Sequence, residues 1–501
     1  MPLARAWSVA LFGVDGVLVE IEADIGGGRP RTQIVGLPDA SLNEAKERVR
    51  AAVRNSQRKW PDELVTLALS PAALPKGGSG YDVALACAVL VAADQEPPER
   101  LDRTVLLGEL ALDGRIRPAR GVLPALIAAR RAGIRRAIVP AQTLAEAALV
   151  TELEVLGAEH LTEVLDWLRG EPDTLRKAHP HPPAQAEQAP DLVDVLGQPE
   201  ARSALEVAAA GGHHLLLIGP PGTGKTMLAR RLPGLLPALT HEQALEVTTV
   251  HSIAGLLSPK SPLVVTPPFI APHHSCTVPA LVGGGTGLAK PGAISAAHRG
   301  VLLLDEACEF APNRLESLRT AMEEGEIRLA RRDGVARYPA RFQLVLATNP
   351  CPCAPARDFD CVCAPNTKRR YLSRLSGPLL DRVDLRVQMR PITALSRADP
   401  TLPESTAVVR ARVLEARARA AERWQKYGWL TNAEVPGPTL RREFGLPRAV
   451  NALLDQSLNS GAVTARGADR CLRVAWTLAD LAGAGQPGAE HVAKALDLRE
   501  R

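Results

Sequence analysis

Apolar and polar positions follow three patterns along this chain of 501 residues. In the first third, runs with a period of two residues, such as Gly16–Asp24 and Leu64–Leu69, alternate with helical patterns such as Ser41–Arg54. The last of these begins with a serine followed three residues later by Glu44, which predicts a capping box at Ser41. The apolar runs then become short and continuous, as in buried parallel strands, and the final hundred or so residues show only helical periodicity.

This succession predicts an α/β protein with three domains. Residues 1–169 form an α+β domain, and residues 170–190 are a polar, proline-rich stretch that indicates a linker. Residues 191–393 form an αβα core around a parallel sheet, and residues 394–501 form a helical domain. The length is sufficient for each domain to bury its own core.

A phosphate-binding loop opens the α/β core. A short apolar run, Leu215–Ile218, leads into a glycine-rich turn and then a helix, which is the setting that this motif requires. We predict that its backbone N–H groups hold the phosphates of ATP, with Lys225 on the β- and γ-phosphates and Thr226 on Mg²⁺. The motif consists of Gly219, Pro220, Pro221, Gly222, Thr223, Gly224, Lys225 and Thr226.

Two later apolar strands end in residues suited to hydrolysis. The run 300–306 ends in Asp305, predicted to hold Mg²⁺, and Glu306, predicted to deprotonate the attacking water. The run 341–350 also ends in a polar residue, Asn349, and it is the family resemblance described below that implies a role for it in holding that water. The alternatives are a solvated acidic turn for the first pair and an ordinary Asn-Pro turn for the second.

Between these two strands, Ile327–Ala330 and Val335–Tyr338 flank a turn and predict a β-hairpin. Guanidinium groups on a narrow hairpin suit sequence-independent contact with DNA phosphates, although a solvated charged hairpin is the alternative. The four arginines are Arg328, Arg331, Arg332 and Arg337.

Four of the eight cysteines fall within thirteen residues, directly after Asn349. They are Cys351, Cys353, Cys361 and Cys363. Four thiolates on one short loop can surround Zn²⁺ tetrahedrally, so we predict a structural zinc site, with reduced free thiols or a redox-labile loop as the alternative. The spacing of all eight does not fit the disulfide framework of a small secreted protein.

Charge and hydropathy add little about partners. The net charge of +5 is compatible with an anionic partner and does not require one. No window of about 18 apolar residues is present, so we expect no membrane-spanning helix and a cytoplasmic protein.

The order of these motifs resembles an AAA+ ATPase of the branch that contains magnesium chelatases and MCM helicases. The insertion Pro267–Gly287 and the following KPGAISAAHRG are most similar to the Mg-chelatase-like YifB/ComM family. That resemblance implies a hexameric ring, with Arg382 in GPLLDRVDL reaching the neighbouring subunit's nucleotide and Arg374 as a second choice for this arginine finger. It also implies a sensor 2 arginine in the helical lid, which falls on Arg473 or, as the weaker match, Arg466.

Residues Val105–Pro140 resemble the end of the Lon protease domain, and Leu74–Gly80 resembles the loop that carries its nucleophilic serine. Alignment places Gly80 at the nucleophile position, with Ser79 one residue early, and Pro124 at the position of the base lysine. Proline has no amine that could activate a serine, so we expect a Lon-like fold without protease activity. Lys76 and Ser79 are then expected to form a turn and a helix start.

The family resemblance implies a DNA translocase or helicase that acts in branch migration during recombination of transforming DNA. The alternative is a chelatase-type ATPase that remodels a protein partner, which we disfavour because a chelatase motor is expected to lack the N-terminal domain. A role as an interaction module with ATP as a switch is disfavoured by the full set of hydrolysis residues. The adjacent pair His273 and His274 could ligate a metal, but neighbouring loop residues rarely reach one ion, so we expect loop roles for both.

Overall fold

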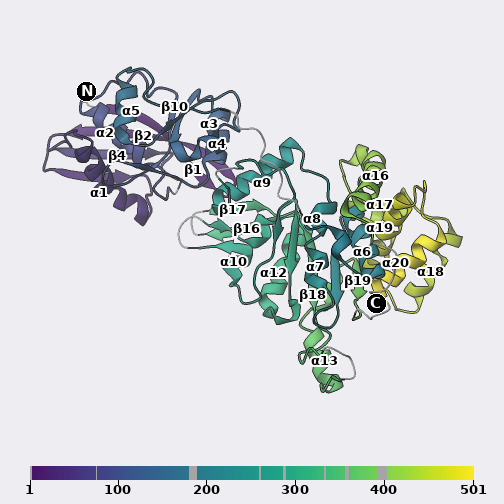
Figure 1. The fold of residues 1–501 in the computed structure, drawn as a ribbon. Helices are drawn as coiled ribbons and strands as arrows, with labels where there is room; N and C mark the ends of the chain where they lie inside the picture. The colour runs from purple at the N-terminus through teal and green to yellow at the C-terminus, as the bar shows by residue number, and fades with distance from the viewer. Residues whose placement is uncertain are drawn as a thin grey trace.

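The computed structural model describes residues 3–74, 76–179, 189–258, 261–285, 289–331, 334–355, 360–391 and 403–500, without the side chains of residues 331, 334 and 500. Three parts follow one another in space as they do in sequence (Figure 1). An N-terminal sheet domain lies at one end, a parallel-sheet core lies in the middle, and a group of C-terminal helices packs at the other end. This is the α/β class that the sequence predicts.

The N-terminal part is built on an eight-stranded sheet with strand order β10-β9-β8-β5-β1-β2-β4-β3. Its long central strands form an antiparallel hairpin, and α2, which is buried along its whole length, packs against both of them. The strands are β1 (Leu3–Phe12), β2 (Asp15–Gly26), β3 (Arg31–Val35), β4 (Leu64–Ser70), β5 (Thr104–Leu106), β8 (Arg136–Pro140), β9 (Glu154–Ala158) and β10 (Arg176–Lys177). The main helices are α1 (Ala40–Asn55), α2 (Asp82–Ala92), α3 (Val122–Arg131) and α5 (Leu161–Leu168).

Two local expectations for this part are corrected. Helix α1 is capped by Asp39, whose side chain accepts a hydrogen bond from the Leu42 N–H at 2.7 Å, and the helix has already begun when the chain reaches Ser41. A serine inside the first turn cannot serve as the N-cap, so the expected capping box does not form. The stretch expected to be a linker also begins within the sheet, because Arg176 and Lys177 pair with β9 as an edge strand.

The core is a parallel sheet of five strands in the order β12-β15-β18-β11-β19. The strands are β12 (Phe269–Ile270), β15 (Val301–Leu304), β18 (Gln343–Thr348), β11 (Leu215–Ile218) and β19 (Leu385–Gln388). The surrounding helices include α6 (Pro199–Gly211), α7 (Lys225–Ala229), α9 (His241–Ala254) and α12 (Pro312–Glu324). The three strands predicted to carry the nucleotide residues, β15, β18 and β11, lie next to one another, so their carboxyl ends meet at one edge.

The predicted hairpin is confirmed as β16 (Glu326–Arg331) and β17 (Gly334–Pro339). The C-terminal helices are α16 (Thr406–Trp424), α17 (Gly437–Arg442), α18 (Arg448–Asn459), α19 (Ala465–Leu481) and α20 (Ala489–Glu500). They share one hydrophobic cluster with α6 and the strands of the core, and Trp424 is completely buried in it. These helices are thus packed on the sheet that carries the phosphate-binding loop.

The N-terminal sheet contacts the core through the turn between β1 and β2. The Val14 N–H donates to the Arg337 carbonyl of β17 at 3.3 Å, and Gly13, with φ of +63°, lies so close that an added Cβ would be 2.2 Å from the same oxygen. Beside this contact, α3 packs against α9, and the Ser252 hydroxyl donates to Glu146. Within the described residues, no helix has both the length and the apolar character needed to cross a lipid bilayer.

Candidate functional site

The phosphate-binding loop has the backbone that its glycines allow. Strand β11 ends at Ile218, and the loop then passes through Gly222 and Gly224, with φ of +78° and +91°, before α7 begins at Lys225. A side chain at either glycine would force a backbone conformation that L residues rarely adopt. The loop is fixed to the neighbouring strand because the Gly219 N–H donates to the Thr348 carbonyl at 3.1 Å.

Lys225 lies inside the curve of this loop. Its Nζ donates to the carbonyls of Gly219 at 2.6 Å and Pro220 at 2.9 Å, and to Oδ1 of Asn349 at 3.1 Å. Burial lowers the pKa of Lys225, and the nearby carboxylates of Asp305 and Glu306 oppose that effect. The lysine of the loop and the polar residue at the end of β18 are therefore in direct contact, as the predicted nucleotide site requires.

Thr226, in α7, and Asp305, directly after β15, form the second contact of the site. The Thr226 hydroxyl donates to Oδ2 of Asp305 at 2.6 Å. Mg²⁺ prefers hard oxygen ligands, and a hydroxyl and a carboxylate oxygen this close fit the pair of donors that a nucleotide-bound Mg²⁺ takes from a protein. The two residues predicted to hold the ion are thus placed together.

Glu306 directly follows Asp305 in a left-handed backbone conformation, with φ of +53°. Its N–H donates to Oδ1 of Asp305 at 3.0 Å, and its side chain is 55% exposed at the edge of the site. Non-glycine residues in this conformation are uncommon and tend to occur where a side chain must be aimed.

Two contacts of this site were not predicted from the sequence. Gln198, at the start of α6, donates from Nε2 to the Thr223 carbonyl at 3.3 Å, so a residue outside the motif touches the phosphate-binding loop itself. His274 lies with Nδ1 3.0 Å from Oε2 of Glu306. Among the described residues, the four cysteines are the group of three or more His, Cys, Asp or Glu side chains whose ligand atoms lie close enough together to hold one metal ion.

Arg382, predicted to act between subunits, and Arg466, one of the two candidates for sensor 2, both lie beside Glu323. The Arg382 guanidinium is almost fully buried and is paired with Glu323, and Arg466, which is largely exposed, lies 4.0 Å from the same carboxylate. Arg473 is instead turned inward, where its Nε donates to the Val435 carbonyl at 2.7 Å. Arg374 is half-exposed and pairs with Glu309 at 3.3 Å.

The hairpin buries one face and exposes the other. Ile327 and Tyr338 form one buried cross-strand pair, while Arg328 and Arg337 form the next pair on the exposed face. Two like charges directly opposite each other are unfavourable unless an anion lies between or beside them, and Glu326 provides one for Arg328 at 2.5 Å. The Arg331 side chain and Arg332 lie outside the described residues.

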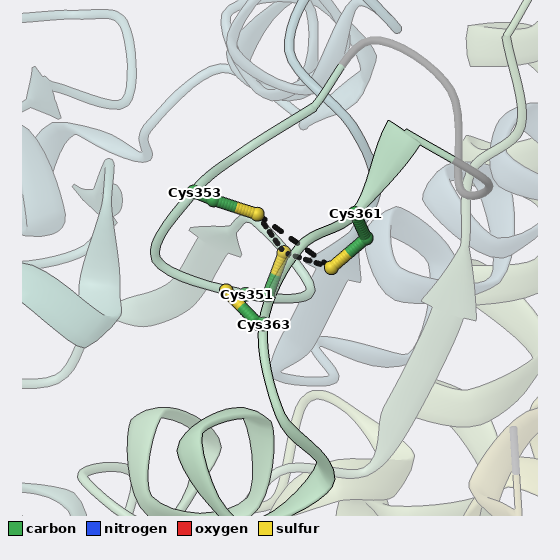
Figure 2. A group of neighbouring side chains, drawn as sticks. All are labelled: Cys351, Cys353, Cys361 and Cys363. Atoms are coloured by element: carbon green, nitrogen blue, oxygen red, sulfur yellow. Dashed lines mark hydrogen bonds between the residues drawn. The ribbon is translucent and has the colours of Figure 1, made fainter.

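The four cysteine sulfurs converge on one point (Figure 2). All lie within 4.8 Å of one another, and the contacts among Cys351, Cys353 and Cys361 measure 3.4 to 3.5 Å. Tetrahedral zinc with bonds of about 2.3 Å separates its sulfurs by about 3.8 Å, so the spacing fits this ion closely. The backbone N–H of Cys363 lowers the pKa of Cys361 to about 6, which supplies a thiolate at neutral pH.

In the N-terminal part, the residues tested for a Ser–Lys dyad have other partners. Ser79 donates to the carboxylate of Glu109. Lys76 is buried and its Nζ donates to the carbonyls of Gly36, at 3.0 Å, and Pro71. Pro124 lies buried within the first turn of α3.

Three family models describe successive parts of the chain. Residues 191–396 match the model for magnesium chelatase, subunit ChlI, residues 21–143 match that for subunit ChlI of Mg-chelatase, and residues 403–499 match that for its C-terminal region. The Haemophilus influenzae competence protein ComM is 40% identical over 510 residues, covering 100% of this chain and 98% of its own. This chain belongs to the Mg-chelatase-like YifB/ComM family of AAA+ ATPases.

Other relatives are also similar to this chain over nearly its whole length. The Escherichia coli protein YifB is 39% identical over 504 residues, covering 100% of this chain and 97% of its own. The uncharacterized protein Rv2897c of Mycobacterium tuberculosis is 59% identical over 505 residues, covering 100% of this chain and 99% of its own. Family membership and the hydrolysis residues gathered around Lys225 support an ATPase.

The predicted Lon-like similarity is also found. Lon protease 1 of Thermus thermophilus is 30% identical over 178 residues, which cover 33% of this chain and 22% of that protein. One argument made from the sequence is weakened, however. Because a model described as subunit ChlI matches residues 21–143, the presence of an N-terminal domain does not by itself count against a chelatase-type function.

Proposed function

We propose that this protein is an ATP-hydrolysing motor that forms a hexameric ring and moves on DNA, acting as a helicase in branch migration. The nucleotide site carries the first part of this proposal. Lys225 and Thr226 open α7 after β11, and they contact Asn349 and Asp305, which follow the neighbouring strands β18 and β15, so a single ATP–Mg²⁺ at that edge reaches all four. Glu306 then has the exposed position that a base for the attacking water needs.

Ring formation is supported by the arginines around Glu323. Finger arginines act on a nucleotide bound by the neighbouring subunit, so they must lie at a subunit edge. Arg382 and Arg466 share one carboxylate that is itself half-exposed, and a neighbouring γ-phosphate can take its place as their partner. We therefore assign the finger to Arg382 and prefer Arg466 to Arg473 for sensor 2, because Arg473 is committed to a buried carbonyl.

The DNA partner is supported by the exposed face of the hairpin and by the similarity to the competence protein ComM. Arg328 and Arg337 stand side by side there, and in the sequence Arg331 and Arg332 fall in the turn that we predict between the two strands. Clustered guanidinium groups neutralise DNA phosphates without reading sequence. Participation in recombination of transforming DNA, in the cytoplasm, is the biological setting that we propose.

DNA-stimulated ATP hydrolysis tests this function. We expect forked or single-stranded DNA to raise the wild-type rate, and the variant Arg328→Ala/Arg337→Ala to lose most of that increase while keeping its rate without DNA. Arg115→Ala is the matched control, because Arg115 is an exposed, ion-paired arginine of the N-terminal part. Stimulation that survives the double substitution excludes the hairpin as the DNA contact.

The chelatase-type alternative, an ATPase that remodels a protein partner, is kept because all three matching models carry the ChlI description. A wild-type protein that hydrolyses ATP at the same rate with and without DNA would favour it. Mass photometry with and without ATP then measures the ring directly.

We also propose that the four cysteines hold a structural Zn²⁺. The loop leads directly into α13 (Pro365–Leu372), which projects from the core (Figure 1), and a metal would fix this projection where little protein surrounds it. We expect a zinc-release assay to find one equivalent per chain in the wild type and none when all four cysteines are changed to serine. Wild-type protein without zinc would leave free thiols as the better interpretation.

A further inference from the structure

The outer edge of hairpin strand β17 is held by the N-terminal part, whose strand β1 ends beside it (Figure 1). Strands β16 and β17 form a sheet of two strands, so each has one edge that faces no other strand of that sheet. Alternate residues of an antiparallel strand direct their N–H and C=O groups to such an edge. Arg337 is one of these residues, because its carbonyl accepts the Val14 N–H at 3.3 Å. The β1–β2 turn therefore occupies the edge of β17 at a residue predicted to contact DNA.

This contact is close as well as polar. A Cβ added at Gly13 would lie 2.2 Å from the carbonyl oxygen and 2.7 Å from the nitrogen of Arg337, which is closer than real Cβ atoms come. Leu11 and Val14 also pack against the hydrophobic cluster that contains Tyr338, on the buried face of the hairpin. The turn thus fits against β17 with both backbone and apolar groups.

The turn is fixed to the core by a second route that does not involve the hairpin. Gly16, which follows the turn, lies against α3, because a Cβ added there would be 2.5 Å from the Cβ of Ala128. Helix α3 packs on α9 of the core. Glu146 joins these two helices, since it accepts the Leu123 N–H of α3 at 2.9 Å and the Ser252 hydroxyl of α9. The turn can therefore act as a fixed support for β17.

Such a support matters because a hairpin of two strands is only marginally stable by itself. Arg337 is exposed, and Arg328 is its cross-strand neighbour. Groups that must be ordered during binding lose affinity, whereas groups already in place do not. A contact that fixes the backbone of Arg337 therefore favours binding of phosphates at this face.

We propose that the β1–β2 turn is a positioning element for DNA binding, in which Gly13 and Val14 hold the edge of β17 and thereby fix the place of Arg337. This role rests on the proposed action on DNA. The N-terminal part then raises the affinity for DNA through the hairpin, without touching the DNA itself. Loss of the contact should weaken the response to DNA and leave ATP hydrolysis without DNA unchanged.

Substitutions at Gly13 test this role through DNA-stimulated ATP hydrolysis. We expect Gly13→Ala to raise the concentration of single-stranded DNA needed for half-maximal stimulation about 5-fold, with the DNA-free rate within about 2-fold of the wild type. Gly13→Asn should show the same loss, because asparagine tolerates a left-handed backbone but brings the same Cβ against Arg337. Gly27→Ala is the matched control, since nothing lies within 4 Å of the added Cβ.

A double substitution shows whether the effect passes through Arg337. In an Arg337→Ala protein there is no guanidinium left to place, so adding Gly13→Ala should change the half-maximal DNA concentration by less than about 2-fold. A full further loss in the double variant overturns the proposed role.

The other results are equally decisive. An unchanged DNA response in Gly13→Ala overturns the positioning role while leaving the proposed function intact. Recovery in Gly13→Asn would assign the effect to the conformation of the turn and not to its contact with β17, and a parallel fall in the DNA-free rate would show general damage to the fold; either overturns the role. A wild-type protein whose ATP hydrolysis does not respond to DNA overturns the proposed function itself, and the role of the turn with it.

Discussion

Two lysines in this chain, Lys76 and Lys225, have nearly the same hydrogen-bond partners but are expected to have different roles. Lys76, in the N-terminal part, is 1% exposed, and its Nζ donates to the carbonyls of Gly36 and Pro71. Lys225, in the core, is 9% exposed, and its Nζ donates to the carbonyls of Gly219 and Pro220. Burial lowers the pKa of both.

The two lysines differ in the other side chains that lie near the Nζ group. Lys225 has a third partner, Asn349, from a neighbouring strand, and two carboxylates near enough to oppose the lowering of its pKa. Burial is the one cause of the shift for Lys76. A lysine in a glycine-rich loop is therefore suited to catalysis where residues from several strand ends surround it. It is suited only to supporting the fold where it joins two loops.

Replacing Lys225 should give the largest effect. The Lys225→Ala protein loses the charge that stabilises the phosphates, so we expect ATP hydrolysis to fall by about 10²–10³-fold. The same substitution leaves the buried Gly219 and Pro220 carbonyls without their donor, so we also expect a loss of about 2–3 kcal/mol in the free energy of unfolding. The measurement is steady-state phosphate release beside urea unfolding, and retained hydrolysis would contradict the assignment of this site.

Replacing Lys76 should lower the stability without changing ATP hydrolysis. The Lys76→Met protein leaves two buried carbonyls without their donor, so we expect a loss of about 2–3 kcal/mol in the free energy of unfolding and unchanged ATP hydrolysis. Lys59→Met, at an exposed lysine of the same part, is the control and should have no measurable effect on stability. If Lys76→Met lost ATP hydrolysis while its free energy of unfolding stayed unchanged, Lys76 too would have a role in hydrolysis.

The pH dependence of the free energy of unfolding, compared between the wild type and Lys76→Met, gives a second test. The pKa of Lys76 is lowered on folding from its ordinary value of 10.5, so between the two values the unfolded chain binds more protons than the folded one. The stability of the wild type, measured relative to Lys76→Met, should therefore rise as the pH increases toward 10.5. A difference that stays constant with pH would show that Lys76 titrates alike in both states.

Disturbing the contact between the β1–β2 turn and the hairpin strand β17 should change the stability by a smaller amount. In Gly13→Ala a methyl group would meet the Arg337 carbonyl in a left-handed conformation, so we expect a cost of about 2 kcal/mol, relieved by separation of the β1–β2 turn from the hairpin. Hydrogen exchange should increase in β17 and in that turn. Gly27→Ala is the control, because nothing lies within 4 Å of the added Cβ there. Unchanged exchange would mean that the turn can shift without opening the contact.

The sequence was sufficient for the strands that carry the nucleotide motifs and for the order of those motifs, because each depends on local pattern, but it did not predict β9, β12 or β19. Leu215–Ile218 and the hairpin over residues 326–339 occur as predicted. Contacts made by pairing between distant strands were not predictable in this way, and His274 on Glu306 is the clearest case. The same holds for Arg382, where the family motif suggested a role but could not show that Glu323 holds the side chain.

The smallest expected effect concerns the start of α1, where the local pattern was misleading. Asp39 accepts hydrogen bonds from the Leu42 N–H, at 2.7 Å, and from the Gly78 N–H, at 3.2 Å, so it joins the helix to the loop that carries Lys76. We expect Asp39→Ala to cost about 1 kcal/mol in urea unfolding, and Ser41→Ala to cost only a few tenths, because Ser41 lies inside the helix. The reverse order would restore Ser41 as the cap. Equal, small effects of the two substitutions would mean that Asp39 adds little to the stability and that the loop is held mainly by the hydrogen bonds of Lys76.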